Sequence, residues 1–487
     1  MILDSHRYEA ARQARDARFD GRFFVGVLTT GIYCRPVCPV RIPRQENVRL
    51  YPSAAAAAEA GFRPCLRCRP EVSPGTPAWL GSSFTVSRAL QLIEQGVMDG
   101  GSVELLASRL GIGTRQLTRL FKRNLGASPI SVAQTRRLHF AKQLIDETTL
   151  PMSDICFAAG FGSIRRFNDL FKSTYGRTPR QLRLGGRKPV KNGGEIKITL
   201  AYRPPFDWRG MLQFLALRAT AGVEEVSDTG YFRTISIEGV TGEFGLVFSA
   251  TDPRAELTID FPDTRQLLNI VEQVRQLFDL KADSVEIEAQ LSEDPLLAIL
   301  VGKYPGLRVP GCWDGFEIAV RAIVGQQVSV KAASTLVGRI TARHGLTYQS
   351  GSGNNNTLIR VFPDTQILVN ADLSGLGIPG RKIAAIHAVA SAVVASELRF
   401  DGSQTIEEFI RRICQIKGIG EWTAQYIALR ALRDPNAFPH GDLILQRSAG
   451  APGKALTASQ LLSRADSWQP WRAYSVLLLW RHYQQTH

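Results

Sequence analysis

Four of the seven cysteines in the chain form two tight pairs near its N-terminus. Cys34 and Cys38 stand in G-I-Y-C-R-P-V-C, and Cys65 and Cys68 stand in R-P-C-L-R-C. This spacing is typical of a zinc site in which four thiolates bind one ion at about 2.3 Å. Three interpretations are open: a purely structural zinc, a zinc-bound thiolate that is also a nucleophile, or disulfides. Disulfides rank last, because the rest of the chain resembles a cytosolic protein.

A second candidate for chemistry lies near the C-terminus, in I-K-G-I-G-E-W-T-A from Ile416 to Ala424. Its glycines, Gly418 and Gly420, permit a tight turn whose backbone N–H groups can approach a DNA phosphate. Asp442 follows and precedes the apolar run L-I-L-Q. An aspartate in that place commonly caps a helix, so capping is the favoured role from the residues alone.

Length and hydropathy limit the class of protein. A chain of 487 residues should hold about three domains, each with its own core. No apolar run approaches the roughly 20 residues that cross a bilayer. The N-terminal sequence M-I-L-D-S-H-R-Y-E-A is too polar for a signal peptide. We therefore expect a cytoplasmic protein, associated with the nucleoid, that has no membrane partner.

The positive charge is confined to one part of the chain. Residues 1–190 contain 29 Lys and Arg against 14 Asp and Glu, whereas residues 191–487 contain 30 of each class. The first part therefore accounts for the whole net charge of +15, which favours a polyanionic partner such as DNA. Arg outnumbers Lys there, which suits phosphate contacts. The alternative is a solvated basic face without a partner.

The elements that must position these residues begin with an internal repeat. Five residues recur at an offset of 50: Leu120, Phe121, Lys122, Gly126 and Pro129 match Leu170, Phe171, Lys172, Gly176 and Pro179. Each copy predicts a helix, a glycine-containing turn and a second helix, as in a helix-turn-helix. The second helices, over 114–124 and 164–174, would present a set of polar side chains to DNA: Arg115, Gln116, Arg119, Arg165, Arg166 and Asn168. A helical bundle with solvated arginines is the alternative.

The remainder divides into strands and helices. Alternating stretches such as F-R-T-I-S-I-E-G predict antiparallel strands over 197–283, and helical periodicity dominates from about Ser292 onward. Segments rich in Pro, Gly and Ser at 70–83 and 185–196 predict linkers, and Gly351–Thr357 predicts a loop.

The chain resembles two known families, one in each part. Residues 1–184 resemble the N-terminal half of bacterial Ada adaptive-response proteins, through T-T-G-I-Y-C-R-P-V-C, R-Q-E-N-V and A-G-F-R-P-C-L-R-C, followed by an AraC-type double helix-turn-helix. Residues 198–487 resemble AlkA-type 3-methyladenine DNA glycosylases, through R-P-P-F-D-W, P-G-L-R-V-P-G-C, R-A-I-V-G-Q-Q-V-S-V, G-I-G-E-W-T-A and W-Q-P-W-R-A-Y.

The Ada resemblance implies a use for the thiols. Cys34 would irreversibly accept a methyl group from a methylphosphotriester of DNA, and Zn²⁺ would be bound by Cys34, Cys38, Cys65 and Cys68. Loss of one negative charge on methylation would tighten DNA binding by the neighbouring repeats. The chain would act as a transcriptional activator with RNA polymerase as a partner. It lacks a P-C-H-R motif, so we expect no O6-methylguanine repair.

The AlkA resemblance implies a monofunctional glycosylase. Asp442 would be catalytic, and four aromatic residues would surround the alkylated purine: Phe214, Trp422, Tyr426 and Trp480. The family's bifunctional relatives have a lysine where this chain has Trp422, so the reaction should stop at an abasic site. Gln327 stands where AlkA has an apolar wedge, Lys417 where the wider superfamily has proline, and Gly441 where AlkA has a second acidic residue.

Together these observations predict a multidomain α+β protein. Its expected parts are a small zinc-binding α/β domain (1–75), an all-α double helix-turn-helix domain (84–184), a linker (185–196), an AlkA-like β subdomain (197–283) and an all-α helix-hairpin-helix glycosylase domain (284–487). The expected function is that of an alkylation sensor and activator fused to a DNA-3-methyladenine glycosylase. The alternative is a regulator with structural zinc whose glycosylase half only binds damaged DNA.

Overall fold

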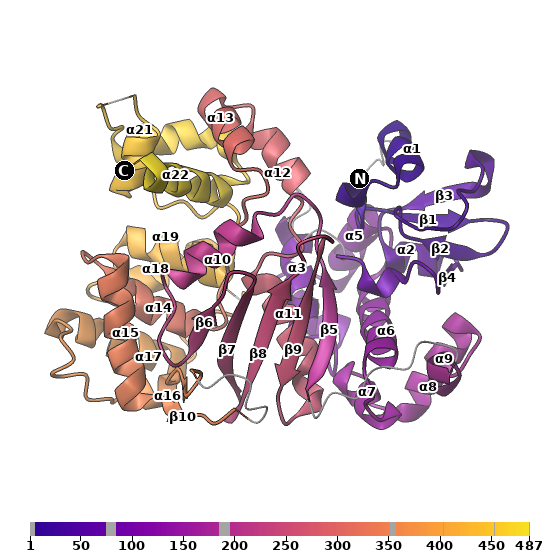
Figure 1. Cartoon of the computed structure of the whole chain (residues 1–487), viewed down its shortest axis with the longest axis horizontal. Helices are drawn as coiled ribbons and strands as arrows, with labels where there is room; N and C mark the ends of the chain where they lie inside the picture. Colours follow the sequence, from indigo (N-terminus) through magenta and orange to yellow (C-terminus); the bar gives the residue numbers. More distant parts are fainter. Residues whose placement is uncertain are drawn as a thin grey trace. The chain divides into compact units, whose positions relative to one another are not determined.

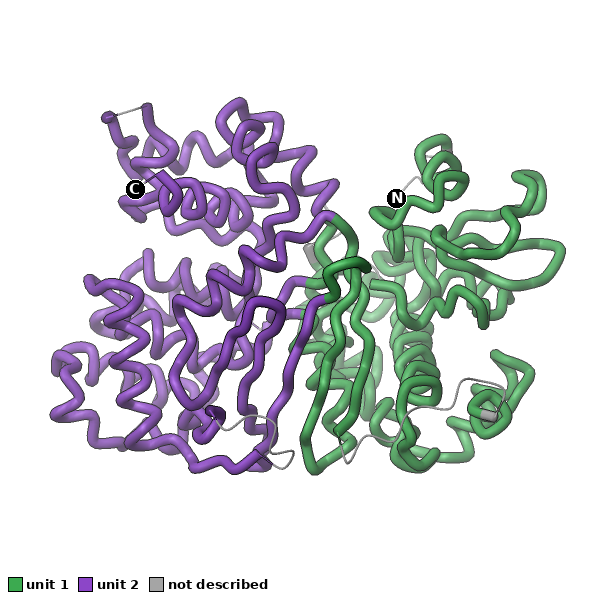
Figure 2. Tube along the Cα trace, viewed as in Figure 1, with its two compact units in different colours: residues 1–204, 249–275, 280–283 green, residues 205–248, 276–279, 284–487 purple. Residues whose placement is uncertain are grey.

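A computed structural model describes residues 5–74, 84–184, 195–350, 357–402, 404–451 and 453–486. The chain forms two compact units (Figure 2). Unit 1 contains Met1–Pro204, Ser249–Arg275 and Leu280–Asp283, and unit 2 contains Pro205–Phe248, Gln276–Asp279 and Ser284–His487. Most of the expected linkers over 70–83 and 185–196, and most of the expected loop over 351–357, lie outside the described residues.

Unit 1 begins with a small four-stranded sheet (Figure 1). Its elements are α1 (Ser5–Ala14), β1 (Phe24–Val27), β2 (Ile32–Cys34), β3 (Val48–Tyr51), α2 (Ala54–Glu59) and β4 (Arg63–Pro64), and the strand order is β3-β1-β2-β4. Strand β1 runs antiparallel to β2 and β3, whereas β2 and β4 are parallel. Buried rings of Tyr8, Phe19 and Phe23 pack on one side of β1.

Seven helices follow among the described residues of unit 1, and they contain the two copies of the repeat. They are α3 (Phe84–Glu94), α4 (Val103–Arg109), α5 (Thr114–Leu125), α6 (Pro129–Glu147), α7 (Met152–Ala158), α8 (Ile164–Tyr175) and α9 (Pro179–Leu184). Helices α5 and α8 bury one apolar face each and end at Gly126 and Gly176, whose φ angles are 69° and 66°. A left-handed residue of this kind closes a helix most easily when it is glycine. The repeat thus predicted both helices to within a residue or two.

Helix α6 is the contact point for the other parts of unit 1. The Tyr33 hydroxyl on β2 and the His139 Nε2 on α6 are 2.8 Å apart. At the end of α6, Glu147 accepts a hydrogen bond of 2.9 Å from the backbone N–H of Thr199. Thr199 lies on β5 (Ile196–Ala201), which pairs antiparallel with β9 (Arg254–Asp260). The AlkA-like segment therefore contributes a strand pair to the unit that holds the thiols.

Unit 2 combines a strand meander with many helices (Figure 1). The meander consists of β6 (Glu224–Val226), β7 (Gly230–Ile237) and β8 (Val240–Phe248), preceded by α10 (Trp208–Ala216). The later elements are α12 (Ser284–Leu291), α13 (Pro295–Lys303), α14 (Gly315–Gly325), α15 (Val330–His344), β10 (Leu346–Thr347), β11 (Arg360–Val361), α16 (Thr365–Leu368), α17 (Gly380–Val394), α18 (Ile406–Cys414), α19 (Glu421–Ile427), α20 (Leu443–Ser448), α21 (Ala458–Arg464) and α22 (Arg472–Thr486).

The expected multidomain α+β class is confirmed. The antiparallel strands expected over 197–283 are present, and two helices, α10 and α11 (Leu267–Leu277), accompany them. Within the described residues, no helix has the length and apolar character that a membrane span requires.

Candidate functional site

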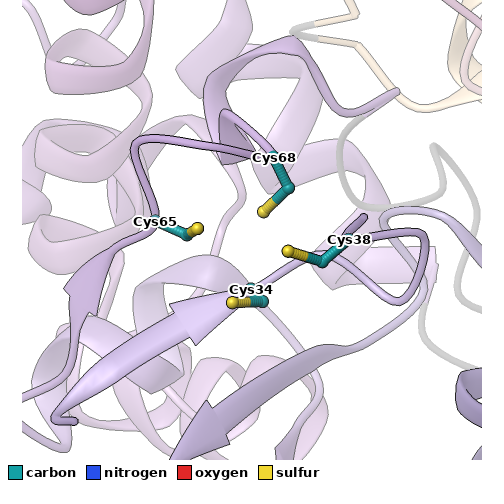
Figure 3. Close-up of side chains that lie close together, drawn as sticks. All are labelled: Cys34, Cys38, Cys65 and Cys68. Atoms are coloured by element: carbon teal, nitrogen blue, oxygen red, sulfur yellow. The ribbon is translucent and has the colours of Figure 1, made fainter. Parts of the chain in front are cut away.

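The four cysteines of the N-terminal pairs converge in unit 1 (Figure 3). The parallel register of β2 and β4 brings Cys34, at the end of β2, beside Cys65, whose backbone N–H donates to Tyr33 O at 3.0 Å. All four side chains are buried, and their sulfur atoms lie within 4.8 Å of one another. Four sulfurs bound to one ion at about 2.3 Å stand about 3.8 Å apart in a tetrahedron. The cluster therefore fits Zn²⁺, and the zinc site expected at Cys34, Cys38, Cys65 and Cys68 is confirmed.

Hydrogen bonds among the four thiols shift their pKa values in opposite directions. They lower the pKa of Cys38 to about 7 and lower that of Cys65, with Cys34 the largest cause in both cases, whereas they raise the pKa values of Cys34 and Cys68. The backbone N–H of Arg35 donates to Cys68 Sγ at 3.3 Å. The Arg35 guanidinium, anchored by Asp20, donates to Cys68 O. Deprotonated thiols are the form that binds a metal, so a bound ion would favour the loss of the remaining protons.

The polar residues predicted to contact DNA lie on the exposed faces of α5 and α8. Buried residues, Leu117 and Phe121 on α5 and Phe167 and Phe171 on α8, form the opposite faces. The exposed set lies in the first half of each helix: Arg115, Gln116, Arg119, Arg165 and Arg166. The side chain of Arg165 is 92% exposed. This exposure lets the side chains reach phosphates or base edges, although Arg165 also lies 4.0 Å from Asp169.

A cleft of about 920 Å³ lies within unit 2. Three of the aromatic residues expected at a base pocket line it: Trp422, Tyr426 and Trp480. The rings of Trp422 and Tyr426 are stacked, with centroids 5.6 Å apart and planes at 10°, and Tyr426 and Trp480 are 6.2 Å apart. Stacked rings of this kind present flat faces to a planar ligand.

Asp442 lies in the wall of the same cleft and is also a helix cap. Its Oδ1 accepts the backbone N–H groups of Ile444 and Leu445 at 2.9 and 3.0 Å, as an N-cap does. Its Oδ2 accepts the indole N–H of Trp422 at 2.9 Å, and the Trp480 indole lies 3.4 Å from Oδ1. The capping role predicted from the sequence is confirmed, and the same contacts fix the carboxylate at the cleft.

Phe214 differs from the expectation, because it is not among the residues that line this cleft. It lines a small neighbouring cavity together with Trp480. The guanidinium of Arg218, four residues further along the chain, covers the Phe214 ring at 3.6 Å, and Arg430 lies 5.1 Å from it. The Arg218 guanidinium thus occupies one face of the Phe214 ring, which stays partly exposed in the small cavity.

Sequence reasoning missed two arginines of the cleft, Arg218 and Arg430. Arg430 donates to the Tyr426 hydroxyl at 3.0 Å. Burial raises the pKa of Tyr426, but Arg430 and Arg218 outweigh it and lower that pKa below its ordinary value. Each arginine follows an aromatic residue by four positions: Arg218 follows Phe214 in the turn after α10, and Arg430 follows Tyr426 in the π-helical turn after α19. This four-residue spacing is the feature of the sequence that could have identified both arginines.

Of the hairpin and loop residues expected at DNA, Gly418 and Gln327 line the cleft. Lys417, Gly418 and Gly420 lie exposed between α18 and α19, and Gly418 has a φ of 95°. Only glycine adopts this conformation readily, which explains the residue type. Gln327, between α14 and α15, is exposed and lines the cleft. Of the other cysteines, Cys156 is buried, whereas Cys312 and Cys414 are half-buried.

Comparison with known proteins assigns the chain to a family. Family models match the metal-binding domain of Ada over residues 7–71, a helix-turn-helix domain over 106–185 and the AlkA N-terminal domain over 197–314. A probable bifunctional transcriptional activator/DNA repair enzyme AlkA of Mycobacterium tuberculosis is 40% identical over 484 residues, which cover 99% of this chain and 97% of the relative. The chain therefore belongs to the family of this bifunctional transcriptional activator/DNA repair enzyme.

Other matches agree with the assignment of the C-terminal part. DNA-3-methyladenine glycosylase 2 of Escherichia coli is 33% identical over 290 residues, which cover 58% of this chain and 96% of that protein. The structure of a 3-methyladenine DNA-glycosylase from Archaeoglobus fulgidus has a TM-score of 0.53 at 21% identity and covers 59% of this chain and 98% of its own. The latter establishes a shared fold. The resemblance read from the sequence to both Ada-type and AlkA-type proteins is thus confirmed.

Proposed function

We propose that this chain detects and repairs alkylated double-stranded DNA at two separate sites. The thiol cluster of unit 1 captures a methyl group from a phosphotriester and the helix-turn-helix repeats then activate transcription. The cleft of unit 2 excises alkylated purines. The observation that carries the proposal is the Asp442 carboxylate, fixed beside stacked rings, in a chain that also holds four converging thiols.

Cys34 is the proposed methyl acceptor among four equally buried cysteines. The resemblance to Ada-type proteins supports the first cysteine of G-I-Y-C-R-P-V-C as the acceptor. The backbone N–H of Arg35 donates to Cys68 Sγ at 3.3 Å. A donor stabilises a thiolate and lowers its nucleophilicity, which disfavours Cys68 as the acceptor.

Methyl transfer changes the charge of the cluster. Bound Zn²⁺ would keep the four thiols deprotonated at neutral pH. The Cys34 sulfur forms a bond to the methyl carbon while the bond from that carbon to the phosphate oxygen breaks, and the electron pair leaves with the phosphodiester. The thioether is neutral, so the cluster loses one negative charge. A unit charge at about 4 Å from a phosphate contributes about 1–4 kcal/mol, which favours tighter DNA binding after transfer.

Helices α5 and α8 would bind the promoter after methyl transfer and so activate transcription. Their exposed residues, Arg115, Gln116, Arg119, Arg165 and Arg166, would contact the major groove of a promoter. RNA polymerase is the proposed partner of the DNA-bound form. A cytoplasmic location at the nucleoid belongs to the same proposal, and it rests on the DNA-directed names of the relatives.

Base excision would use the cleft of unit 2. The exposed hairpin residues Lys417, Gly418 and Gly420 would contact a phosphate, and the alkylated purine would rotate out of the duplex to stack on Trp422 and Tyr426. The bond between the sugar and the purine nitrogen then breaks, and its electron pair leaves with the base. Asp442 stabilises the cationic sugar until water adds to it. Position 422 offers no amine for a covalent intermediate, so the product would be an abasic site.

One experiment with the full chain tests both halves. The protein is incubated with methylated duplex DNA, then peptide mass spectrometry measures methylation of Cys34 and chromatography measures released 3-methyladenine. We expect a single methyl group on Cys34, free base in excess over protein, and DNA strands that stay uncut. Unmodified Cys34 would overturn the sensor assignment. The absence of free base would favour the alternative of a regulator whose second half binds damaged DNA without catalysis.

A further inference from the structure

The loop between α14 and α15 holds Gln327 at the mouth of the cleft. Gln327 is exposed and lies next to Val328, which is 41% exposed. Its φ angle is 58°, a left-handed conformation that residues with a Cβ adopt rarely. Such a conformation persists only where surrounding contacts hold it.

Four hydrogen bonds hold the base of this loop in place. The buried Lys382 ammonium donates to Val324 O at 2.9 Å and to Gln326 O at 2.6 Å, at the end of α14. The Gln326 amide nitrogen donates to Gly418 O at 2.9 Å and to Thr423 Oγ1 at 3.1 Å. The loop is thereby joined to α17 on one side and to the hairpin on the other, so the direction of Gln327 is fixed.

Arg381 determines which atoms of the Gln327 amide remain free. Its Nη2 donates to Gln327 Oε1 at 3.0 Å. A glutamine side chain has one acceptor oxygen and one NH₂ donor, whereas an arginine side chain has only donors. Because the guanidinium binds the amide oxygen, the pair presents N–H donors to whatever lies in front of it. An apolar wedge at the same place would offer no hydrogen bond.

We propose that Gln327 and Arg381 read the base opposite the extruded lesion and favour cytosine there. This inference rests on the proposed base excision, in which the loop fills the gap left by the flipped purine and meets the unpaired partner. The Watson–Crick edge of cytosine has two adjacent acceptors, N3 and O2. Thymine separates its two acceptors by an N–H, and adenine and guanine each offer one acceptor beside donors. A surface of donors alone matches cytosine best, so a given lesion is excised faster opposite cytosine than the other contacts of the cleft would allow.

Single-turnover excision of one lesion in four contexts tests this reading. A 7-methylguanine is placed opposite C, T, A or G in otherwise identical duplexes, and the rates of wild type and Gln327→Leu are compared. The ratio of the two rates cancels the easier opening of mismatched pairs. We expect the loss caused by Gln327→Leu to be about tenfold larger opposite cytosine than opposite the other bases. Arg381→Met should show the same pattern, because it releases the amide oxygen.

Lys331→Met is the matched control. Lys331 is an exposed cation on α15, four positions from Gln327, and removing it lowers DNA attraction without touching the amide. It should slow all four contexts equally. Equal losses in all four contexts for Gln327→Leu, with excision retained, would overturn the inference. Absence of excision by the wild type in every context would overturn the proposed function itself, and thermal unfolding of each variant identifies a failure to fold.

Discussion

Two aspartates of unit 2, Asp442 and Asp294, have almost the same local geometry. Asp294 Oδ1 accepts the backbone N–H groups of Leu296 and Leu297 at 2.9 and 3.2 Å, and so caps α13 as Asp442 caps α20. Asp294 Oδ2 accepts the indole N–H of Trp468 at 3.1 Å, as Asp442 Oδ2 accepts that of Trp422. A capping aspartate bonded to an indole is therefore not in itself an active site.

The difference lies in what else surrounds each carboxylate. Arg464 neutralises Asp294 through a contact of 3.0 Å. Among the described residues no Lys, Arg or His forms an ion pair with Asp442, which lines the cleft beside stacked rings. The cap positions both carboxylates, but of the two only Asp442 lines the cleft without such an ion-pair partner. The comparison teaches that the counterion and the cleft, rather than the cap and the indole, distinguish the two aspartates.

The largest effect is expected from removing the charge at each aspartate in turn. Asn can still accept a backbone hydrogen bond at an N-cap, so Asp442→Asn and Asp294→Asn should both fold. Asp442→Asn should slow base release by about 10²–10³-fold, because it removes an electrostatic contact to the transition state. Asp294→Asn should keep the rate. Single-turnover assays measure the rate of base release by each variant. Equal losses of rate in both variants would contradict the difference drawn between the two aspartates.

The two tryptophans allow a finer test. Trp422→Phe deletes the donor to Asp442 Oδ2 while leaving a ring to stack on Tyr426, and a hydrogen bond to a charged group contributes about 1.5–3 kcal/mol. We expect excision to slow about tenfold or more. Trp468→Phe deletes the equivalent donor to Asp294 and should lower only the free energy of unfolding, measured by urea denaturation. A loss of rate in Trp468→Phe as large as that in Trp422→Phe would contradict this account.

Local patterns predicted some of these features and not others. The spacing of the thiols predicted the metal site, and the residues around Asp442 predicted its cap, because both depend on short stretches of chain. The counterion of Asp294 comes from Arg464, 170 residues away, and nothing local marks it. The place of Phe214 outside the cleft was not predicted either, although the Arg218 that covers its ring follows it by only four positions. Tertiary contacts, rather than the pattern, separate the two aspartates.

The smallest expected effect comes from removing Arg464, the ion-pair partner of Asp294. Burial raises the pKa of Asp294, but hydrogen bonds from Arg464 and Trp468 outweigh it and lower that pKa. A depressed carboxyl pKa adds stability above the unfolded pKa, and this contribution is lost as the pH falls through the folded pKa. Arg464→Met should therefore cost about 1 kcal/mol of unfolding free energy at neutral pH, and the difference should shrink below about pH 4. A difference independent of pH would contradict the ion pair.

Separation of the two activities tests the central claim most directly. Wild type, Cys34→Ser and Asp442→Asn are each incubated with one preparation of methylated duplex DNA, and protein methylation and free 3-methyladenine are measured in the same tubes. We expect Asp442→Asn to become methylated at Cys34 without releasing base, and Cys34→Ser to release base without becoming methylated. Base release by Asp442→Asn at the wild-type rate, or methylation of Cys34→Ser to the wild-type extent, would contradict the assignment of one reaction to each site.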